Sequence, residues 1–230
     1  LGDYEDCAQT ITWLEMHGLP VLGEVRQYAP NWVFPKSQAA TILYEDDTLA
    51  VIDAQANGGL LYGSLAVDLA YLKAMQAGFA HIKLKQAKYR QLIIPSLVAV
   101  AQRGVHLAVF WQESGQHHQL TVDAHADYPC YWIYDIDSTV HQPPNAQTLS
   151  ILCSPNMALK QPLDVAQSGY ALTSCLNPDD FATNYAYHNE RGLDIDVDIW
   201  QQLITLSKAV LVESTALSRL RGAGELASDQ

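Results

Sequence analysis

The densest group of chemically versatile residues lies near the end of the chain, within Glu213–Gly224. The members that could contact a ligand are Ser218, Arg219, Arg221, Gly222 and Gly224. Glycines that adopt positive φ can turn backbone N–H groups toward an anion, and an arginine adds a forked contact to a carboxylate or phosphate. We therefore predict a site for a small anionic metabolite here. The alternative is structural, with Ser214 capping a short helix that Gly222 ends.

A second candidate is the alternating run Asp123-Ala-His125-Ala-Asp127. The alternation predicts a strand over 119–127, which would place all three polar side chains on one face. Two carboxylates and an imidazole suit a divalent metal, so a metal-dependent hydrolase is a third functional hypothesis. The alternative is a polar strand that faces solvent with its alanines inward. Further acids and histidines stand close by in the sequence: His117, His118, Asp135 and Asp137.

Other patterns assign no reaction. Asp194-Ile-Asp196-Val-Asp198 precedes a helical pattern, and we expect Asp198 to cap that helix. The four cysteines form no Cys-x-x-Cys pair, and we expect them to be buried thiols. No Gly-x-Gly-x-x-Gly or Walker loop is present in the sequence. Whether the protein is an enzyme, which residues would be catalytic and which cofactor it would use stay unassigned.

Charge and hydropathy limit the partners. The chain has 25 acidic and 13 basic residues and a formal net charge of −12, which disfavours nucleic acid and anionic membranes. No apolar stretch reaches the ~18 residues that a spanning helix needs. The first residues are acidic, unlike those of a signal peptide. We expect an acidic, soluble, cytoplasmic protein with a small-molecule ligand.

The elements that must position these residues alternate between helical and strand patterns. Apolar spacing predicts helices over 3–18, 64–77 and about 95–104, and one that begins at Asp198. Strands are predicted over 41–44, 48–53, 80–85, 105–112, 119–127, 131–137 and 149–153. Residues 154–195 give no clear pattern. The expected fold is α+β: a single compact domain over 1–230, with a mainly antiparallel or mixed central sheet and helices at both chain ends.

Several short motifs resemble a bacterial family of unknown function, DUF3726. They are Ser218-Arg-Leu-Arg-Gly-Ala-Gly224 after Glu213-Ser214, and Tyr4-Glu-Asp6, Trp13-Leu14 and His17-Gly-Leu19 in the first helix. The resemblance implies a bacterial origin and an Arg-Gly-Ala-Gly run upstream of the first helix, so we expect the chain to be truncated at its N-terminus. The tail, residues 225–230, departs from the family's ending and is a candidate for disorder.

The family carries no known activity to transfer, so two hypotheses from different classes stay open. The first is an enzyme-like protein that binds an anionic metabolite through the C-terminal arginines and glycines. The second is a non-catalytic structural or assembly subunit, whose C-terminal segment packs on a partner or on a second copy. A homo-oligomer is compatible with both hypotheses.

Overall fold

The computed structural model describes residues 2–24, 39–55, 59–136, 147–159 and 170–210. They belong to two compact units. The larger unit comprises residues 1–21 and 34–193, and the smaller comprises residues 22–33 and 194–230. Helix α7 (Val197–Val210) belongs to the smaller unit. That residues 1–230 form one domain stays a prediction.

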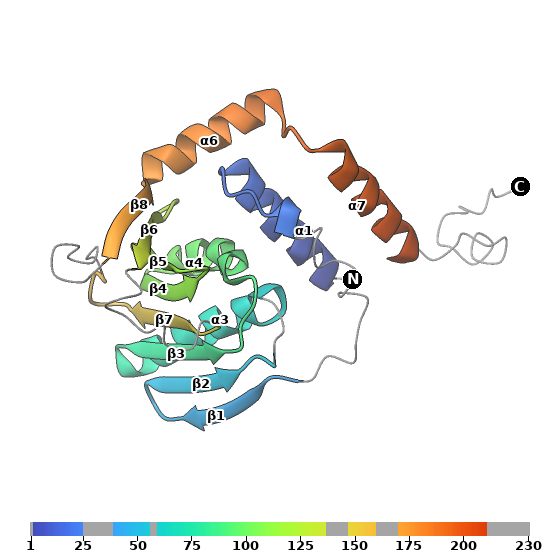
Figure 1. The fold of residues 1–230 in the computed structure, drawn as a ribbon. Coiled ribbons are helices and arrows are strands. Elements are labelled where there is room, and N and C mark those ends of the chain that lie inside the picture. Colours follow the sequence, from blue (N-terminus) through green and yellow to red (C-terminus); the bar gives the residue numbers. More distant parts are fainter. Residues whose placement is uncertain (1, 25–38, 56–58, 137–146, 160–169, 211–230) are drawn as a thin grey trace, which may run out of the picture. The chain divides into compact units, whose positions relative to one another are not determined.

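The larger unit is built on an eight-stranded sheet with the order β1-β2-β3-β7-β4-β5-β6-β8 (Figure 1). The strands are β1 (Thr41–Glu45), β2 (Leu49–Asp53), β3 (Ala80–Lys85), β4 (His106–Glu113), β5 (Gln116–Val122), β6 (Cys130–Ile136), β7 (Leu149–Ser154) and β8 (Tyr170–Leu176). Strands β2 and β3 pair in parallel, and every other neighbouring pair is antiparallel. The sheet is therefore mixed, which confirms the predicted α+β class.

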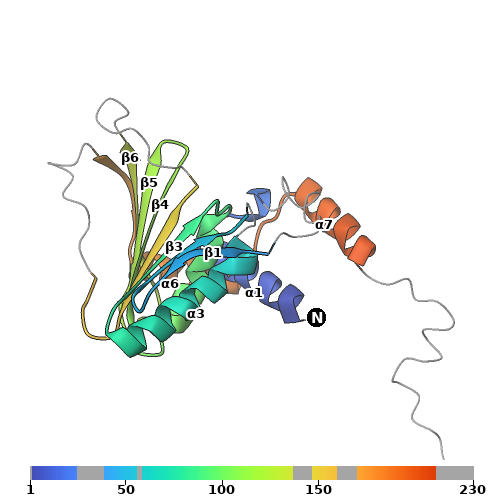
Figure 2. The ribbon, with the colours of Figure 1, turned by 90° about the horizontal axis from the view of Figure 1, so that it is seen from below.

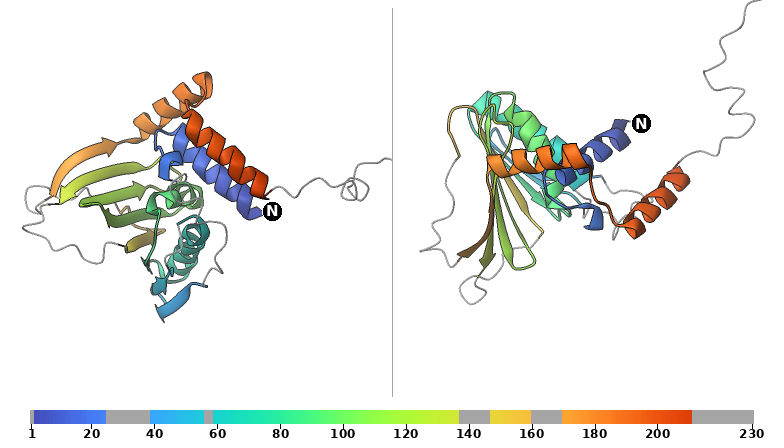
Figure 3. Two further views of the ribbon diagram at one scale, coloured as in Figure 1. Left: turned by 45° about the vertical axis from the view of Figure 1, so that its right-hand side comes forward. Right: turned by 90° about the horizontal axis from the view of Figure 1, so that it is seen from above.

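The helices of this unit lie on one side of the sheet (Figure 2). They are α1 (Gly2–Met16), α3 (Gly59–Ala77), the 3-10 helix η2 (Arg90–Ile93), α4 (Ile94–Ala101) and α6 (Pro178–Arg191). Helix α3 packs on β3 and β7, and α4 packs on β4 and β5. Two further views show α3 and α4 over the same side of the strands (Figure 3). Helix α1 rests on α4 and α6, one layer further out.

The core fills the layer between sheet and helices. Alternate residues of β3 and β7 are buried, because successive side chains of a strand point to opposite faces. From the helix side, α3 contributes small residues that let its backbone approach the sheet: Ala66, Ala70 and Ala74. Within the described residues, we find no helix with the length and hydropathy to cross a bilayer.

Most of the predicted elements are present, with four corrections. Strand β5 covers 116–122 instead of 119–127, and Asp196 caps α7 where Asp198 was expected, since its Oδ1 accepts the Asp198 N–H at 2.8 Å. Strand β8 and helix α6 occupy the stretch that gave no pattern. The expectation of four buried thiols is wrong, because only Cys153 is buried, Cys7 and Cys130 are partly exposed, and Cys175 is exposed.

Candidate functional site

The C-terminal anion-site prediction lies outside the described residues. Ser218, Arg219, Arg221, Gly222 and Gly224 all belong to the stretch 211–230. The tail at 225–230 lies in the same stretch. The structure therefore leaves the predicted contact between these residues and an anionic ligand as a prediction.

The second candidate set lies in the loop after β5 and not on a strand. Asp123 Oδ1 is 3.2 Å from His106 Nδ1, and Asp127 accepts a hydrogen bond from Gln102 Nε2 at 3.1 Å. His125 has a positive φ of 62° and donates its backbone N–H to Ala101. The three side chains therefore do not share a strand face, which corrects the premise of the metal hypothesis. Among the described residues, no group of three or more His, Cys, Asp or Glu side chains could hold a metal ion.

The structure gathers a different set of polar and aromatic side chains at the β4–β5 hairpin. Ser114 and Gly115 form its two-residue turn, both with positive φ, which is the geometry that matches the twist of paired strands. The register places Trp111 opposite His118 and Gln112 opposite His117. Because side chains alternate across a sheet, Trp111 and His118 face the helices, whereas Gln112 and His117 face the other way.

Three rings stack on the helix-facing side. The Trp111 and His118 rings are parallel within 2°, with centroids 4.8 Å apart, and Tyr131 of β6 follows with its centroid 5.8 Å from that of Trp111. His118 Nδ1 and the Tyr131 hydroxyl are 2.7 Å apart and share a hydrogen bond. The Trp111 and Tyr131 rings fix the orientation of the imidazole, and its Nδ1 is hydrogen-bonded to the Tyr131 hydroxyl.

Arg90 brings a buried positive charge to the same end of the sheet. Its side chain is 4% exposed and pairs with Glu113 Oε1 at 2.9 Å, whereas the Glu113 side chain is 47% exposed. The guanidinium also donates to the carbonyl of Ala87 at 2.9 Å. Tyr89, the residue before, has a positive φ of 51° and turns the chain into η2. The guanidinium of Arg90 is therefore held by the Ala87 carbonyl on one side and by the half-exposed carboxylate of Glu113 on the other.

Two nitrogen donors of this cluster have no hydrogen-bond partner in the part of the chain that the structure describes. They are Arg90 Nε and Trp111 Nε1, and both atoms are buried. Buried donors are nearly always hydrogen-bonded in proteins, and each one left unpaired costs about 1–3 kcal/mol. An unsatisfied guanidinium N–H and an unsatisfied indole N–H are suited to an acceptor-rich ligand such as a carboxylate.

The electrostatics of the cluster keep His118 neutral. Burial, followed by the neighbouring His117 and the charge of Arg90, lowers the pKa of His118 to about 4. At pH 7 the imidazole therefore carries one N–H and one lone pair. It can exchange a hydrogen bond with a hydroxyl or carbonyl group without adding a second positive charge beside Arg90.

The opposite face of the hairpin has its own polar pair. Both ring nitrogens of His117 and Oε1 of Gln112 are buried and lack a hydrogen-bond partner among the described residues. Burial lowers the pKa of His117, and the Tyr170 ring lies 5.2 Å from the imidazole. This face is aromatic and uncharged, whereas the helix-facing side holds the charges of Arg90 and Glu113.

Sequence reasoning found only part of the cluster. His117 and His118 stood out as neighbours of the acidic run, and Trp111 was expected as a core residue, which its burial confirms. Arg90 was missed because its partner Glu113 is 23 positions away on another element, so no local spacing links them. The available signal was an arginine two positions before the apolar run Leu92-Ile93-Ile94.

Comparison with known proteins shows which solved structures share the fold of this chain. A scan against protein-family models and a search of curated proteins found no match. Among solved structures, the sulfolactate dehydrogenase of Methanocaldococcus jannaschii matches with a TM-score of 0.62 at 12% identity, covering 91% of each chain. The malate dehydrogenase of Pyrococcus horikoshii matches with a TM-score of 0.61 at 10% identity, covering 93% of this chain and 90% of that one.

A putative malate/lactate dehydrogenase from E. coli matches in the same way, with a TM-score of 0.60 at 12% identity. The match covers 96% of this chain and 92% of that one. At these identities the likeness concerns the arrangement of helices and strands alone. This chain therefore shares its fold with proteins named as malate, lactate and sulfolactate dehydrogenases.

Proposed function

We propose that this protein binds a small carboxylate of the hydroxy-acid or oxo-acid class at the β4–β5 hairpin. The observation that carries the proposal is Arg90, a buried guanidinium with one unsatisfied N–H and a half-exposed acidic partner, Glu113. The names of the structural neighbours support the ligand class, since malate, lactate and sulfolactate each have a carboxylate beside a hydroxyl-bearing carbon.

Each group of the cluster has a role in this proposal. Arg90 forms a forked, charge-assisted contact with the ligand carboxylate, in exchange for its contact with Glu113. Trp111 Nε1 donates a further hydrogen bond to the same group. His118, neutral and held by Tyr131, meets the hydroxyl or carbonyl oxygen of the ligand. Glu113 competes with the ligand, because its carboxylate is bound to the Arg90 guanidinium when no ligand is present.

The proposal covers binding and not a redox step. The ligand site proposed here lies at the β4–β5 hairpin, whereas the sequence predicted one near the end of the chain. An anion site within Ser218–Gly224 stays a separate prediction, and mutation of Arg219 tests it.

The test is calorimetric titration of the full chain with malate, lactate and sulfolactate. Arg90→Gln should weaken binding about tenfold or more, since a hydrogen bond to a charged group contributes roughly 1.5–3 kcal/mol. Glu113→Gln should strengthen binding, because it removes the competing carboxylate. Arg103→Gln is the matched control: this exposed arginine pairs with Asp68 at 3.0 Å, on another part of the surface.

Two variants, one at a buried residue and one at a half-exposed residue, guard the test against misfolding. Arg90→Gln alters a buried group, so its circular dichroism must match that of the wild type, whereas Glu113 is half exposed and its change to Gln leaves the core intact. Equal affinities in wild type, Arg90→Gln and Glu113→Gln would refute the proposal. Loss of binding in Arg219→Ala alone would move the site to the C-terminal segment.

A further inference from the structure

The edge strand β1 is exposed along its whole length. All five residues, Thr41–Glu45, are exposed, and among the strands that the structure describes β1 pairs with β2 alone. Ile42 and Leu43 are each more than half exposed. Such edges invite pairing with another strand, and proteins usually blunt them with lysine, proline or a bulge. This strand has a bulge between Ile42 and Tyr44 but neither lysine nor proline.

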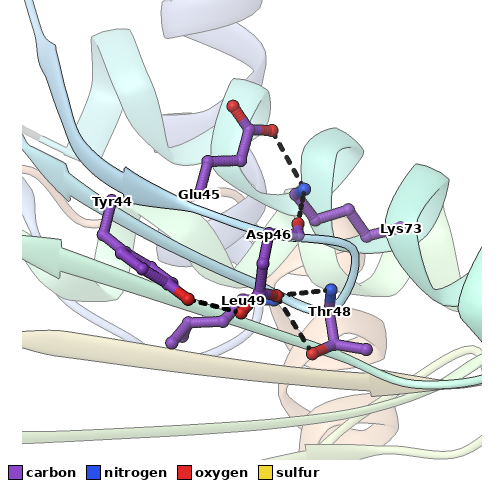
Figure 4. A network of polar contacts seen from close by, with 6 residues as sticks. All are labelled: Tyr44, Glu45, Asp46, Thr48, Leu49 and Lys73. Carbon is purple, nitrogen blue, oxygen red and sulfur yellow. Dashed lines mark hydrogen bonds and ion pairs between the residues drawn. The ribbon is translucent and has the colours of Figure 1, made fainter.

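A polar network holds β1 in place although its residues face solvent (Figure 4). Lys73 of α3, itself buried, pairs with Glu45 at 2.9 Å and donates to the backbone carbonyl of Asp46. The Asp46 carboxylate accepts the backbone N–H groups of Thr48 and Leu49 at 2.8 and 2.7 Å, which lowers its pKa to about 2. The strand is therefore presented to solvent in a fixed conformation, which reduces the entropy lost on docking.

Helix α3 adds an apolar stripe next to this edge. Leu65, Leu72 and Met75 are each more than half exposed. Leu65 and Leu72 are two turns apart on one line of the helix, and Lys73, the neighbour of Leu72, reaches β1. Lys73 thus ties the helix to the strand, and the stripe together with the strand edge is here called the β1–α3 surface.

The charged residues of the β1–α3 surface are paired within the chain, Glu45 with Lys73 and Asp68 with Arg103. Helix α3 has two charged residues in 19, and both belong to these pairs. The chain as a whole has 25 acidic residues. A mainly apolar area whose few charges are already paired is suited to a protein partner and not to an ionic ligand.

The exposed area fits a dimer interface of modest size. A large side chain that is half exposed offers on the order of 100 Å². Leu65, Leu72, Met75 and Ile42, which the register places on the helix side with Ile52, therefore offer about 400 Å² per copy, or roughly 800 Å² for two copies. The paired strand backbones bring the total toward the ~1,000 Å² at which specific interfaces begin.

We propose that a second copy of this chain docks on the β1–α3 surface. An antiparallel β1–β1 pair related by a two-fold axis satisfies both free backbone edges at once, and it brings the two α3 stripes to the same side of the joined sheet. The other sheet edge, β8, is less suited, since Leu172 is its only large exposed apolar residue. The proposal is independent of ligand binding at the hairpin.

The test is the mass of the full chain by light scattering or sedimentation. The wild type should have twice the chain mass at micromolar concentration. Leu72→Glu should raise the dimer dissociation constant by roughly tenfold or more, because the new carboxylate would be buried without a partner. Leu43→Pro should do the same, because a proline on an edge strand disfavours pairing with another strand. Leu172→Glu on β8 is the matched control and should leave the dimer intact.

Two further measurements distinguish this interface from others. Hydrogen exchange of the Thr41–Glu45 amides should slow as protein concentration rises. Salt should tighten the dimer, since it screens the repulsion between two chains of net charge −12. A wild type that is monomeric at all accessible concentrations overturns the proposal. So does a dimer that survives Leu72→Glu and shows no slowing at β1, which would place the contact elsewhere.

Discussion

Trp111 and His118 stand directly opposite each other on β4 and β5, with their rings 2° from parallel and 4.8 Å apart. The stack covers the imidazole, and this burial is the largest cause of its lowered pKa. The same pair lies next to Arg90, which adds a smaller lowering. Burial, to which this stack contributes, therefore keeps the imidazole of His118 neutral at pH 7, with smaller contributions from His117 and Arg90.

The first prediction concerns pH. His118 has a pKa of about 4 in the fold against 6.5 in the unfolded chain, so below pH 6.5 the unfolded state binds the extra proton. Its contribution to stability is complete above pH 6.5 and is lost as the pH falls toward 4, by up to about 3 kcal/mol. Urea unfolding between pH 7.5 and 4 should show this decline. The pKa values of His17 and His117, also lowered, act in the same direction.

His118→Gln keeps a partner for Tyr131 and cannot titrate, so its stability should fall less steeply with decreasing pH. His125→Gln, a change at an exposed histidine in the loop after β5, is the control and should follow the wild type. If the stability of the wild type and of His118→Gln fell equally steeply with pH, the decline could not be due to His118.

A second prediction concerns Gly18, which ends helix α1. It has a φ of 80°, and a Cβ there would collide with the side chain of Asn184 on α6. Gly18→Ala should therefore destabilise the fold by about 1–3 kcal/mol, through both backbone strain and the displaced contact between α1 and α6. Thermal unfolding measures the loss. Gly115→Ala separates the two causes, since its φ is also 80° but no atom lies within 4 Å of the added Cβ.

A third prediction concerns the start of α6. The Asn177 side chain accepts the N–H groups of Asp179 and Asp180, and Asp180 accepts the N–H of Asn177 in return. Asn177→Ala should destabilise the protein by about 1 kcal/mol, as the loss of a helix cap usually does. Asn177→Ser should restore most of the loss in the same denaturation assay. A smaller effect of Ala than of Ser would show that the capping box does not hold this helix.

The cysteines give a fourth prediction. Burial raises the pKa of Cys153 to about 12, so at pH 8 it has almost no reactive thiolate. Cys175 is exposed, and its pKa is raised by partial burial and by Asp180. A thiol reagent should therefore modify Cys175 slowly and Cys153 only after unfolding. Mass mapping of the labelled peptides checks the order, and rapid labelling of Cys153 in the native protein would contradict it.

The sequence predicted those elements whose pattern is local. Alternation identified β3 within its true bounds, because one of its faces is fully buried. It misplaced the end of β5, since the alternation continues through Asp123-Ala-His125-Ala-Asp127 while the pairing stops at Val122. What ends the strand is the turn at His125, whose N–H bonds the carbonyl of Ala101. That bond joins distant parts of the chain, which a local pattern cannot reveal.

Helix α6 was missed although its start carries a signal. Asn177-Pro-Asp-Asp180 combines a capping residue, a proline at the first helical position and an acid that closes the capping box. The helix itself is polar, with Phe181 as its buried residue, so its apolar periodicity is weak. The candidate site was out of reach for another reason: Arg90, Glu113 and Tyr131 meet only through the sheet order and the packing of η2 against it.

The position of β7 in the sheet sets the order in which the protein can be completed during synthesis. Residues 149–154 form the strand that joins β3 to β4, so every strand made earlier belongs to one of two incomplete sheets until β7 leaves the ribosome. Until then, the edges of β3 and β4 expose apolar residues such as Ile82 and Val109, which are fully buried in the finished core. Such late, non-local pairing slows folding and leaves the nascent chain prone to aggregation. We therefore expect the nascent chain to be most prone to aggregation until Ser154 has left the ribosome.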